Sequence, residues 1–443
     1  MIQPVVLAAL VASAVSAPES RSGAQSCQPC HVRETPGVVR VWAESAHGRA
    51  KIGCAECHGA DGPRNHPSDG ARAAVEASAC RRCHPKAAAQ HAASKHGIGF
   101  RAGRGCTRGA AVAPGAEAGC AACHEPGSAQ PRERAECARF LTQSPAMQRQ
   151  GCTACHAIEA RCDTCHGAHR TERAVARDPV TCATCHMGPD HAQYEMWKTS
   201  RHGAVYAVKG LTEAPDCATC HMPEGTHDVG QGISMDLAGN AYPAERRERE
   251  RARMLDVCAR CHTRTFARRQ LADGDTVQRE SKALVEQAVA IVRDLDRLGL
   301  LDPAPASRPP HPLSGPRLEL GPQMLYENLS RPEAILFRMK KFSYVTAYKG
   351  VFHQNPDYAH WYGNAPLKLA LSELQSESAL LRKLRLVEER LGRSASPAPA
   401  DSAGTAGALL GELRELRERR VRGELDDAAL ERRQREVLER AGR

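Results

Sequence analysis

The chain has 443 residues and a formal charge of +10, and only 4% of its residues are aromatic. Large apolar side chains are therefore too scarce to build an ordinary enzyme core, and no second apolar run approaches about 18 residues, which excludes a multi-span membrane protein. The chain instead contains 20 cysteines and 20 histidines, which predicts that these side chains bind something that fills the interior.

The first 17 residues resemble a secretory signal peptide. Val5 to Val15 is apolar, and the Ala-Val-Ser-Ala sequence that ends at Ala17 is typical of a cleavage site for export. We therefore expect residues 1–17 to be removed and the protein to be periplasmic. The alternative is an N-terminal anchor helix, although the run is short for a bilayer span.

Residues 18–265 form the predicted haem-binding domain, in which 18 of the 20 cysteines occur in nine Cys-x-x-Cys-His motifs. Chance alone would give only about 0.04 copies of this motif in a chain of this composition. The motif cysteines are Cys27, Cys30, Cys54, Cys57, Cys80, Cys83, Cys120, Cys123, Cys152, Cys155, Cys162, Cys165, Cys182, Cys185, Cys217, Cys220, Cys258 and Cys261. The motif histidines are His31, His58, His84, His124, His156, His166, His186, His221 and His262.

The motif is typical of covalent c-type haem attachment, because two thiols can add to the two vinyl groups of one haem while the adjacent histidine binds the iron. Zinc and iron–sulfur sites also use Cys-x-x-Cys, but neither needs a histidine after every pair. The sequence therefore predicts nine haem c groups, and a vacant axial site on one of them would suit catalysis. We expect a mainly α fold with a haem-packed core and little or no sheet.

The second axial ligands are expected among the eleven histidines outside the motifs, because bis-histidine ligation suits electron transfer. Three of them share a Ser-x-His-Gly context, and three others lie close to motifs. These six predicted ligands are His47, His96, His202, His91, His169 and His227. His66, His353 and His360 are further candidates, whereas His311 lies between prolines and is expected in a surface loop.

The remainder of the chain lacks cysteine and is predicted to be helical. Residues 266–393 form a C-terminal helical domain, with helical apolar spacing over 278–299, 322–350 and 365–392. Residues 394–407 form a linker rich in Pro, Ala, Ser and Gly. Residues 408–443 form a charged helical tail, which weakly resembles a short bacterial oligomerisation motif or is simply a solvated helix pair.

Two segments resemble the hydroxylamine oxidoreductase family of multihaem cytochromes c. The first contains Cys-Ala-Thr-Cys-His-Met-Gly-Pro-Asp-His, which places Gly-Pro-Asp-His directly after the Cys182 motif. The second is Ala-Tyr-Lys-Gly-Val-Phe-His-Gln-Asn-Pro-Asp-Tyr, ending at Tyr358. The resemblance covers most of residues 27 to 390, although the family pattern has eight haems where this chain has nine motifs.

The resemblance implies a catalytic haem at the Cys162 motif, with Asp190 and His191 as its distal acid–base pair. In oxidising members a tyrosine of a neighbouring subunit is cross-linked to that haem, and Tyr358 is the candidate here, followed by Tyr362. From the residues alone, His191 could equally be a distal ligand and Asp190 a helix cap. The resemblance also implies a homo-oligomer, often a trimer.

These features predict a hydroxylamine oxidoreductase-like enzyme that acts on small nitrogen compounds and relays electrons through bis-histidine haems. A nitrite or hydroxylamine reductase and a non-catalytic electron conduit are the alternatives. We expect a partner cytochrome or a membrane quinone oxidoreductase to exchange electrons with it. Nucleic acid is not an expected partner, because nine haems would bring about 18 propionates and turn the +10 charge negative.

Overall fold

The computed structural model describes residues 24–59, 75–97, 158, 161–189, 192–235, 239–302, 330–394, 400–422 and 424–441. Seven of the nine motifs lie within these residues. The predicted signal peptide, the Cys120 and Cys152 motifs, Asp190 and His191 lie outside them.

The chain divides into two compact units, and the first consists of residues 1–83 and 161–175. Its described part contains short helices separated by turns. They are α1 (Ala24–Glu34), α2 (Pro36–Glu44), α3 (Ala46–Arg49), α4 (Cys54–His58), α5 (Ala77–Arg81) and α11 (Asp163–His166), and α12 (Arg173–Arg177) crosses into the second unit. Helices α4 and α11 consist of little more than a haem motif. A helix of this length is unstable in water by itself, so these helices depend on their surroundings for stability.

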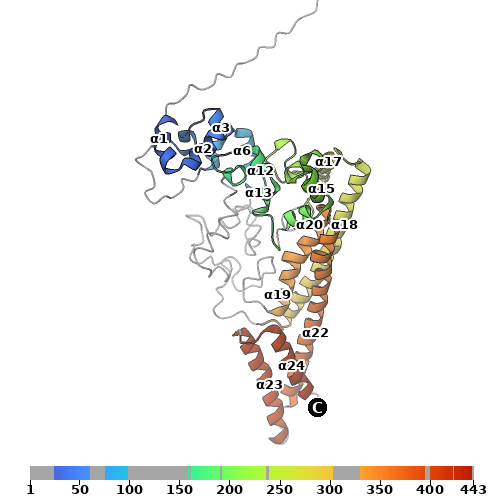
Figure 1. The fold of residues 1–443 in the computed structure, drawn as a ribbon. Helices are drawn as coiled ribbons and strands as arrows, with labels where there is room; N and C mark the ends of the chain where they lie inside the picture. Colours follow the sequence, from blue (N-terminus) through green and yellow to red (C-terminus); the bar gives the residue numbers. More distant parts are fainter. Residues whose placement is uncertain are drawn as a thin grey trace, which may run out of the picture. The chain divides into compact units, whose positions relative to one another are not determined.

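The second unit, residues 84–160 and 176–443, begins with short helices around the motifs and ends with long ones (Figure 1). The short elements are α6 (Pro85–Ala93), α13 (Pro179–Ala183), α14 (Gln193–Lys198), α15 (Arg201–Lys209), η6 (Gly210–Thr212), α16 (Cys217–His221) and η7 (Pro223–Gly225). The later elements are α17 (Ala244–Cys258), α18 (Arg264–Arg297), α19 (Arg331–Arg338), η9 (Met339–Tyr344), α20 (Val345–Phe352), α21 (Pro356–Ala359), η10 (His360–Asn364), α22 (Ala365–Ser394), α23 (Ala400–Val421) and α24 (Asp427–Ala441).

The largest side-chain core joins α18, α19, α20 and α22. Ala288 and Val292 on α18, Met339 on η9, and Leu367 and Leu374 on α22 have no exposed surface. Successive buried positions on α18 are separated by three or four residues, as an amphipathic helix requires. This apolar bundle supports the loop that carries His353 and Tyr358.

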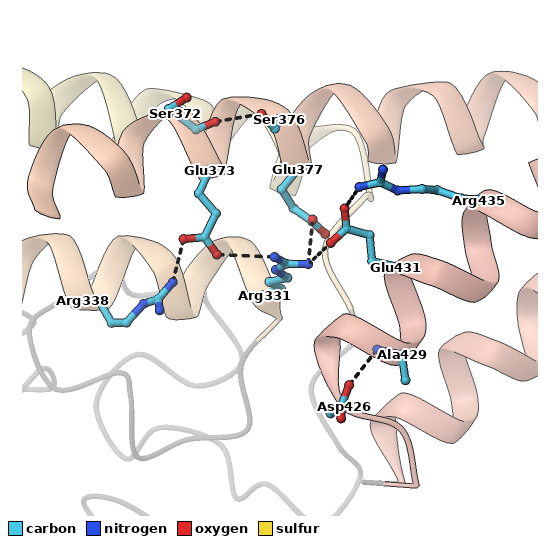
Figure 2. A network of polar contacts seen from close by, with 10 residues as sticks. All are labelled: Arg331, Arg338, Ser372, Glu373, Ser376, Glu377, Asp426, Ala429, Glu431 and Arg435. Carbon is cyan, nitrogen blue, oxygen red and sulfur yellow. Dashed lines mark hydrogen bonds and ion pairs between the residues drawn. The ribbon is translucent and has the colours of Figure 1, made fainter.

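A second core attaches the C-terminal hairpin α23–α24 to α18 and α22. Leu413 on α23 and Val437 on α24 are 1% exposed and pack with Leu384 on α22 and Leu295 on α18. Beside this core, Arg331 at the start of α19 contacts carboxylates of α22 and α24, as Figure 2 shows. The hairpin therefore packs on the bundle within this chain.

The predicted fold class is confirmed: the described residues are helical, and their only β-type pairing is an isolated bridge between Met235 and Ala241. The predicted helix over 278–299 begins earlier, at Arg264, because Thr263 caps it by accepting a hydrogen bond from Phe266 N at 3.3 Å. Helix α23 begins at Ala400, inside the predicted linker, where four alanines between 400 and 408 favour helix. The other predicted domain boundaries stay predictions.

No helix in the described ranges is both long enough and apolar enough to span a bilayer.

Candidate haem sites and distal pocket

Two of the haem motifs are each a single helical turn, which explains their spacing. Cys54–His58 is all of α4 and Cys217–His221 is all of α16. In a helix, residues i, i+3 and i+4 lie on one face, so both thiols and the imidazole point to the same side. The described motif cysteines form no disulfides. Each turn therefore presents the three groups that one haem needs.

The Cys217 motif is fixed by a buried carboxylate. Asp216, which is 1% exposed, caps α16 by accepting hydrogen bonds from Thr219 N and Oγ1, both at 2.6 Å. Arg177 donates to both carboxylate oxygens of Asp216 at 3.0–3.1 Å. This bidentate pair connects the segment before the Cys182 motif to the start of the Cys217 motif.

Cysteines of different motifs interact in series. In the first unit, burial raises the pKa of Cys54, and the neighbouring thiol of Cys27 raises it further. Burial and the thiol of Cys80 likewise raise the pKa of Cys162, to about 12. In the second unit, a hydrogen bond with Cys182 and burial raise the pKa of Cys217. Because each motif cysteine marks a haem edge, haems attached at these motifs would have neighbouring edges.

Burial also raises the pKa of Cys220 to about 12, with Cys258 contributing. The second unit therefore contains a series of three motifs that begin at Cys182, Cys217 and Cys258.

Four motif histidines each face a histidine from outside the motifs at nearly the same distance. The ring centroids are 6.0 Å apart for His58 and His169, for His186 and His96, and for His262 and His202, and 6.2 Å apart for His221 and His353. A metal–imidazole bond is about 2.0–2.1 Å long, and a ring centroid lies roughly 1.1 Å beyond its nitrogen. Two imidazoles on opposite sides of one iron therefore have centroids about 6.2 Å apart, so these pairs fit a haem iron between them.

Burial favours the neutral form of His221 and His96, which is the form that binds a metal. Burial lowers the pKa of His221 to about 3, with the charges of His353 and His186 adding to the effect. Burial likewise lowers the pKa of His96 to about 4. A neutral imidazole has a nitrogen lone pair available for iron at any ordinary pH.

The repeated Ser-x-His-Gly sequence forms the same helix corner three times. Its serines Ser45, Ser94 and Ser200 are at most 3% exposed. Each serine hydroxyl accepts a hydrogen bond from the glycine amide three residues later, at 3.0, 3.4 and 3.3 Å respectively. The serine therefore caps the new turn and fixes the position of the histidine within it.

The glycine of each corner is required by close packing. A Cβ atom on Gly48, Gly97 or Gly203 would lie 2.1–2.2 Å from the carbonyl oxygen six residues earlier. That oxygen belongs to the end of the preceding helix, so this helix and the turn that contains the glycine meet with no space for a side chain. The corner thus explains why histidines in this context are well-placed ligands.

His169 occupies a strained position in the first unit. Its φ is 63°, and Gly167 and Thr171 beside it also have positive φ angles of 73° and 46°. Left-handed conformations are unfavourable for residues with a side chain, and such strain concentrates at functional sites. The strained turn presents the His169 ring to His58.

His353 is the ligand candidate that the predicted set of six omitted. It lies on the loop after α20, and its Nδ1 is 2.7 Å from the carbonyl oxygen of Lys349. A metal-binding histidine commonly donates its other ring N–H to a carbonyl, so Nε2 is the nitrogen left for iron. The sequence gives His353 as a further candidate, but nothing in its local sequence indicates that it faces His221, which is distant in the chain.

The remaining predicted ligands have other surroundings. His47 Nδ1 is 2.8 Å from Thr171 Oγ1. Burial and then the charge of His227 lower the pKa of His91, while a hydrogen bond with the Ile158 backbone opposes this. His227 in turn lies within electrostatic reach of His84. Among motif histidines, His31 Nδ1 is 2.8 Å from Thr35 Oγ1.

Tyr358 is positioned by a buried asparagine that sequence reasoning missed. Asn355, which is 4% exposed, caps α21 by accepting a hydrogen bond from Tyr358 N at 3.0 Å. The side-chain amide of Asn355 donates to Met196 O at 2.8 Å and Thr199 Oγ1 at 2.7 Å, at the end of α14. The Asn-Pro pair is a helix-start signal. Tyr358 is thereby attached to the helix that follows the Gly-Pro-Asp-His sequence.

Tyr358 is half-buried beside a second tyrosine and a carboxylate. Its ring centroid is 4.6 Å from that of Tyr362, and the side chain of Tyr362 is largely exposed. Burial raises the pKa of Tyr358, and the charge of Glu195 on α14 raises it further.

Comparison with known proteins identifies the family. Residues 50–309, more than half of the chain, match the family described as "Seven times multi-haem cytochrome CxxCH". The chain belongs to this multihaem cytochrome family. The multihaem cytochrome binds c-type haems covalently through its Cys-x-x-Cys-His motifs.

A curated relative is a probable nitrite reductase–hydroxylamine oxidoreductase fusion protein of Kuenenia stuttgartiensis. It is 25% identical over 81% of this chain and 52% of its own length. The multihaem cytochrome thus spans about half the length of the relative that it matches. The predicted resemblance to hydroxylamine oxidoreductase-like proteins is confirmed.

Two solved structures share the fold with a TM-score of 0.61 each. One is a reducing HAO-like protein complex of Kuenenia stuttgartiensis, 23% identical, with 82% of this chain and 86% of that chain covered. The other is a hypothetical multiheme protein, 16% identical, with 83% and 97% covered. At these identities the likeness concerns the fold.

Proposed function

We propose that this multihaem cytochrome is a periplasmic enzyme that performs redox chemistry on small nitrogen compounds and carries nine haems. The observation that carries the proposal is the attachment of Tyr358 to α14 through Asn355. It brings Tyr358 to the helix that begins shortly after Gly-Pro-Asp-His in its own chain, whereas the resemblance would take the cross-linked tyrosine from a neighbouring subunit. The name of the curated relative supports chemistry on nitrite or hydroxylamine.

The proposed catalytic haem is attached at Cys162 and Cys165, with His166 as its axial ligand. When bound, an open ferric haem supplies an electron acceptor that can bind a nitrogen lone pair. Oxidation of hydroxylamine releases protons, so a base is needed beside the substrate. Asp190 and His191 would supply it, with the carboxylate orienting the imidazole or raising its basicity.

Electron transfer away from this site would use bis-histidine haems. The four histidine pairs with centroids 6.0–6.2 Å apart support this ligation. The cysteine contacts between motifs support short steps between neighbouring haems. A separate cytochrome or a membrane quinone oxidoreductase would exchange these electrons, and the chain would form a homo-oligomer, as a trimer by resemblance.

The reductive direction is the second candidate, because one solved relative is described as a reducing HAO-like complex. In that direction nitrite or hydroxylamine would accept electrons and Tyr358 would stay uncross-linked. A non-catalytic conduit would instead need two axial histidines at every haem.

Mass spectrometry of a tryptic digest of the purified holoprotein separates these functions. A haem peptide containing Cys162–His166 joined to the Tyr358 peptide is expected for the oxidase. An uncross-linked haem peptide together with a high-spin electron paramagnetic resonance signal would favour the reductase. A protein with nine low-spin haems and no high-spin signal would contradict catalysis.

A further inference from the structure

The turn that follows the Cys162 motif has several residues in left-handed backbone conformations. Gly167, His169 and Thr171 have φ angles of 73°, 63° and 46°. Thr171 is the least suited of the three to such an angle, because its Cβ is branched and left-handed conformations crowd a branched side chain. Thr171 N donates a hydrogen bond to Gly167 O at 3.2 Å, which closes the turn. The turn therefore keeps a threonine where glycine or asparagine would be less strained.

The side chain of Thr171 contacts the predicted axial ligand His47. Both residues belong to the first compact unit, and Thr171 Oγ1 lies 2.8 Å from His47 Nδ1, which is an ordinary hydrogen-bond length. The neighbouring Arg170 reaches Glu44 through an exposed ion pair that is 3.8 Å long, and such a pair contributes little. The hydrogen bond to His47 is therefore the contact that explains a threonine at this strained position.

The backbone of His47 is held by its own helix corner. Ser45, which is fully buried, accepts a hydrogen bond from Gly48 N at 3.0 Å. Ile52 N donates to His47 O at 2.9 Å. The corner thus fixes where the side chain of His47 begins, whereas the Thr171 hydroxyl contacts the imidazole ring itself.

The hydrogen bond also indicates which ring nitrogen faces iron. A neutral imidazole that binds iron through one nitrogen carries its proton on the other, and that N–H commonly donates to a hydrogen-bond acceptor. The Thr171 hydroxyl oxygen can accept from Nδ1–H, which directs Nε2 of His47 to the metal. His353 has the same arrangement with a backbone carbonyl, because its Nδ1 is 2.7 Å from Lys349 O.

We infer that Thr171 is a positioning residue for the axial ligand His47, so that one strained turn places ligands of two haems. The same turn presents His169 to His58, with ring centroids 6.0 Å apart. That pair completes one iron, so His47 belongs to a second haem. The inference rests on the bis-histidine ligation in the proposed function. It makes the Thr171 oxygen a determinant of the reduction potential of the haem that His47 ligates, since hydrogen bonds to axial ligands tune haem iron.

The test is a spectroelectrochemical titration of the holoprotein that carries Thr171→Val. Valine keeps the branched shape and the strain of threonine but has no hydroxyl. Loss of the acceptor makes the His47 imidazole less electron-rich, which favours ferrous iron. The equilibrium constant for reduction of one haem should therefore rise about threefold or more, a positive shift of about 30 mV at about 59 mV per tenfold for one electron.

Thr171→Ser is the conservative variant, because serine keeps the hydroxyl oxygen, and its potentials should match those of the wild type. Thr276→Ala is the control: it removes an exposed hydroxyl on α18 that donates to Ala272 O at 3.1 Å, and no potential should change.

Thr171→Gly provides a second measurement if the valine variant binds fewer haems. Glycine relieves the strain and also lacks the hydroxyl, so the same rise is expected in a protein with full haem content. Unchanged potentials in a variant without the hydroxyl and with full haem content would overturn the inference. The same rise in Thr171→Ser would overturn it too, since the shape of the side chain and not its oxygen would then be responsible.

His47→Ala separates failure of this inference from failure of the predicted ligation. Loss of an axial ligand should convert one low-spin haem to high spin, measured by electron paramagnetic resonance. A His47→Ala holoprotein that keeps every low-spin haem would show that His47 is not a ligand, and the ligation and the inference would fall together. A His47→Ala protein with one opened haem, alongside Thr171 variants with wild-type potentials, would contradict the role of Thr171 alone.

Discussion

Gly203→Ala tests whether the helix corner positions His202, the proposed axial ligand. The added Cβ would lie 2.2 Å from Trp197 O and 2.5 Å from Lys198 O. Non-bonded carbon and oxygen atoms normally stay more than about 3 Å apart, so one helix must move by about 1 Å. Both oxygens belong to the backbone of the preceding segment, so no side-chain rotation can relieve the clash.

The consequence for haem binding follows from the tolerance of metal–ligand bonds, which is about 0.2 Å. A displacement of about 1 Å separates the His202 ring from its place opposite His262, now 6.0 Å away by ring centroid. We expect an overpacking cost of about 1–3 kcal/mol and conversion of one low-spin haem to high spin. Absorbance and electron paramagnetic resonance spectra of the holoprotein, with the thermal unfolding midpoint, measure both effects.

Gly411→Ala is the matched control for this substitution. Gly411 lies within α23, and a Cβ there would meet nothing within 4 Å. Alanine should stabilise that helix by about 0.5–1 kcal/mol and leave the spectra unchanged. If Gly203→Ala keeps the wild-type low-spin spectrum and midpoint, the corner does not fix the ligand and the reasoning fails.

The remaining predictions concern the ligand set and the C-terminal hairpin. His353→Ala should open one haem, which is measured as one additional carbon monoxide site per reduced chain. Substitution of the exposed His360 is the control and should open none. Equal carbon monoxide binding by both variants would contradict the pairing of His353 with His221. Arg331→Met leaves three carboxylates close together and should lower the free energy of unfolding by about 2–3 kcal/mol, which faster proteolysis of the hairpin would show. Arg433→Met breaks an exposed ion pair and should lower it by less than about 1 kcal/mol. A similar loss of stability in both variants would refute the role of the Arg331 network. Hydrogen bonds from arginines lower the pKa of Glu431, so its contribution is complete above the ordinary glutamate pKa of about 4.3 and is lost as pH falls below it; the hydrogen-exchange protection factors of the hairpin, which correct for the pH dependence of intrinsic exchange, should fall on acidification. Protection factors that fall on raising the pH would contradict this sign.

The sequence predicts the haem motifs because their chemistry is local. Two thiols and an imidazole within one helical turn define the site without any distant residue, as α4 and α16 illustrate. The apolar spacing of Leu409, Leu413 and Leu416 also predicts a buried face, and all three are at most 9% exposed. Periodicity identifies such a face because a helix repeats every 3.6 residues.

The axial pairings depend on contacts between distant residues, and here the sequence is less informative. His96 and His202 were identifiable because the Ser-x-His-Gly context repeats, and the structure explains the repeat as a corner. His353 has no such context and faces His221 only because α20 packs on the long helices. Asn355 is similar, since its partner Thr199 lies on another helix.

Helix α14 shows how a short segment can have several functions in this protein. Six residues cannot form a stable helix alone, and α14 is stabilised by burial of Met196 and Trp197, at 1% and 9% exposure. Trp197 also donates a hydrogen bond to Pro215 O at 3.0 Å, next to the start of the Cys217 motif. Glu195, Asn355 and His202 are all positioned from this helix. Asn355 donates to Met196 O, and Ser200, which caps the helix that contains His202, donates to Trp197 O, so a substitution that shifts α14 should displace both contacts together.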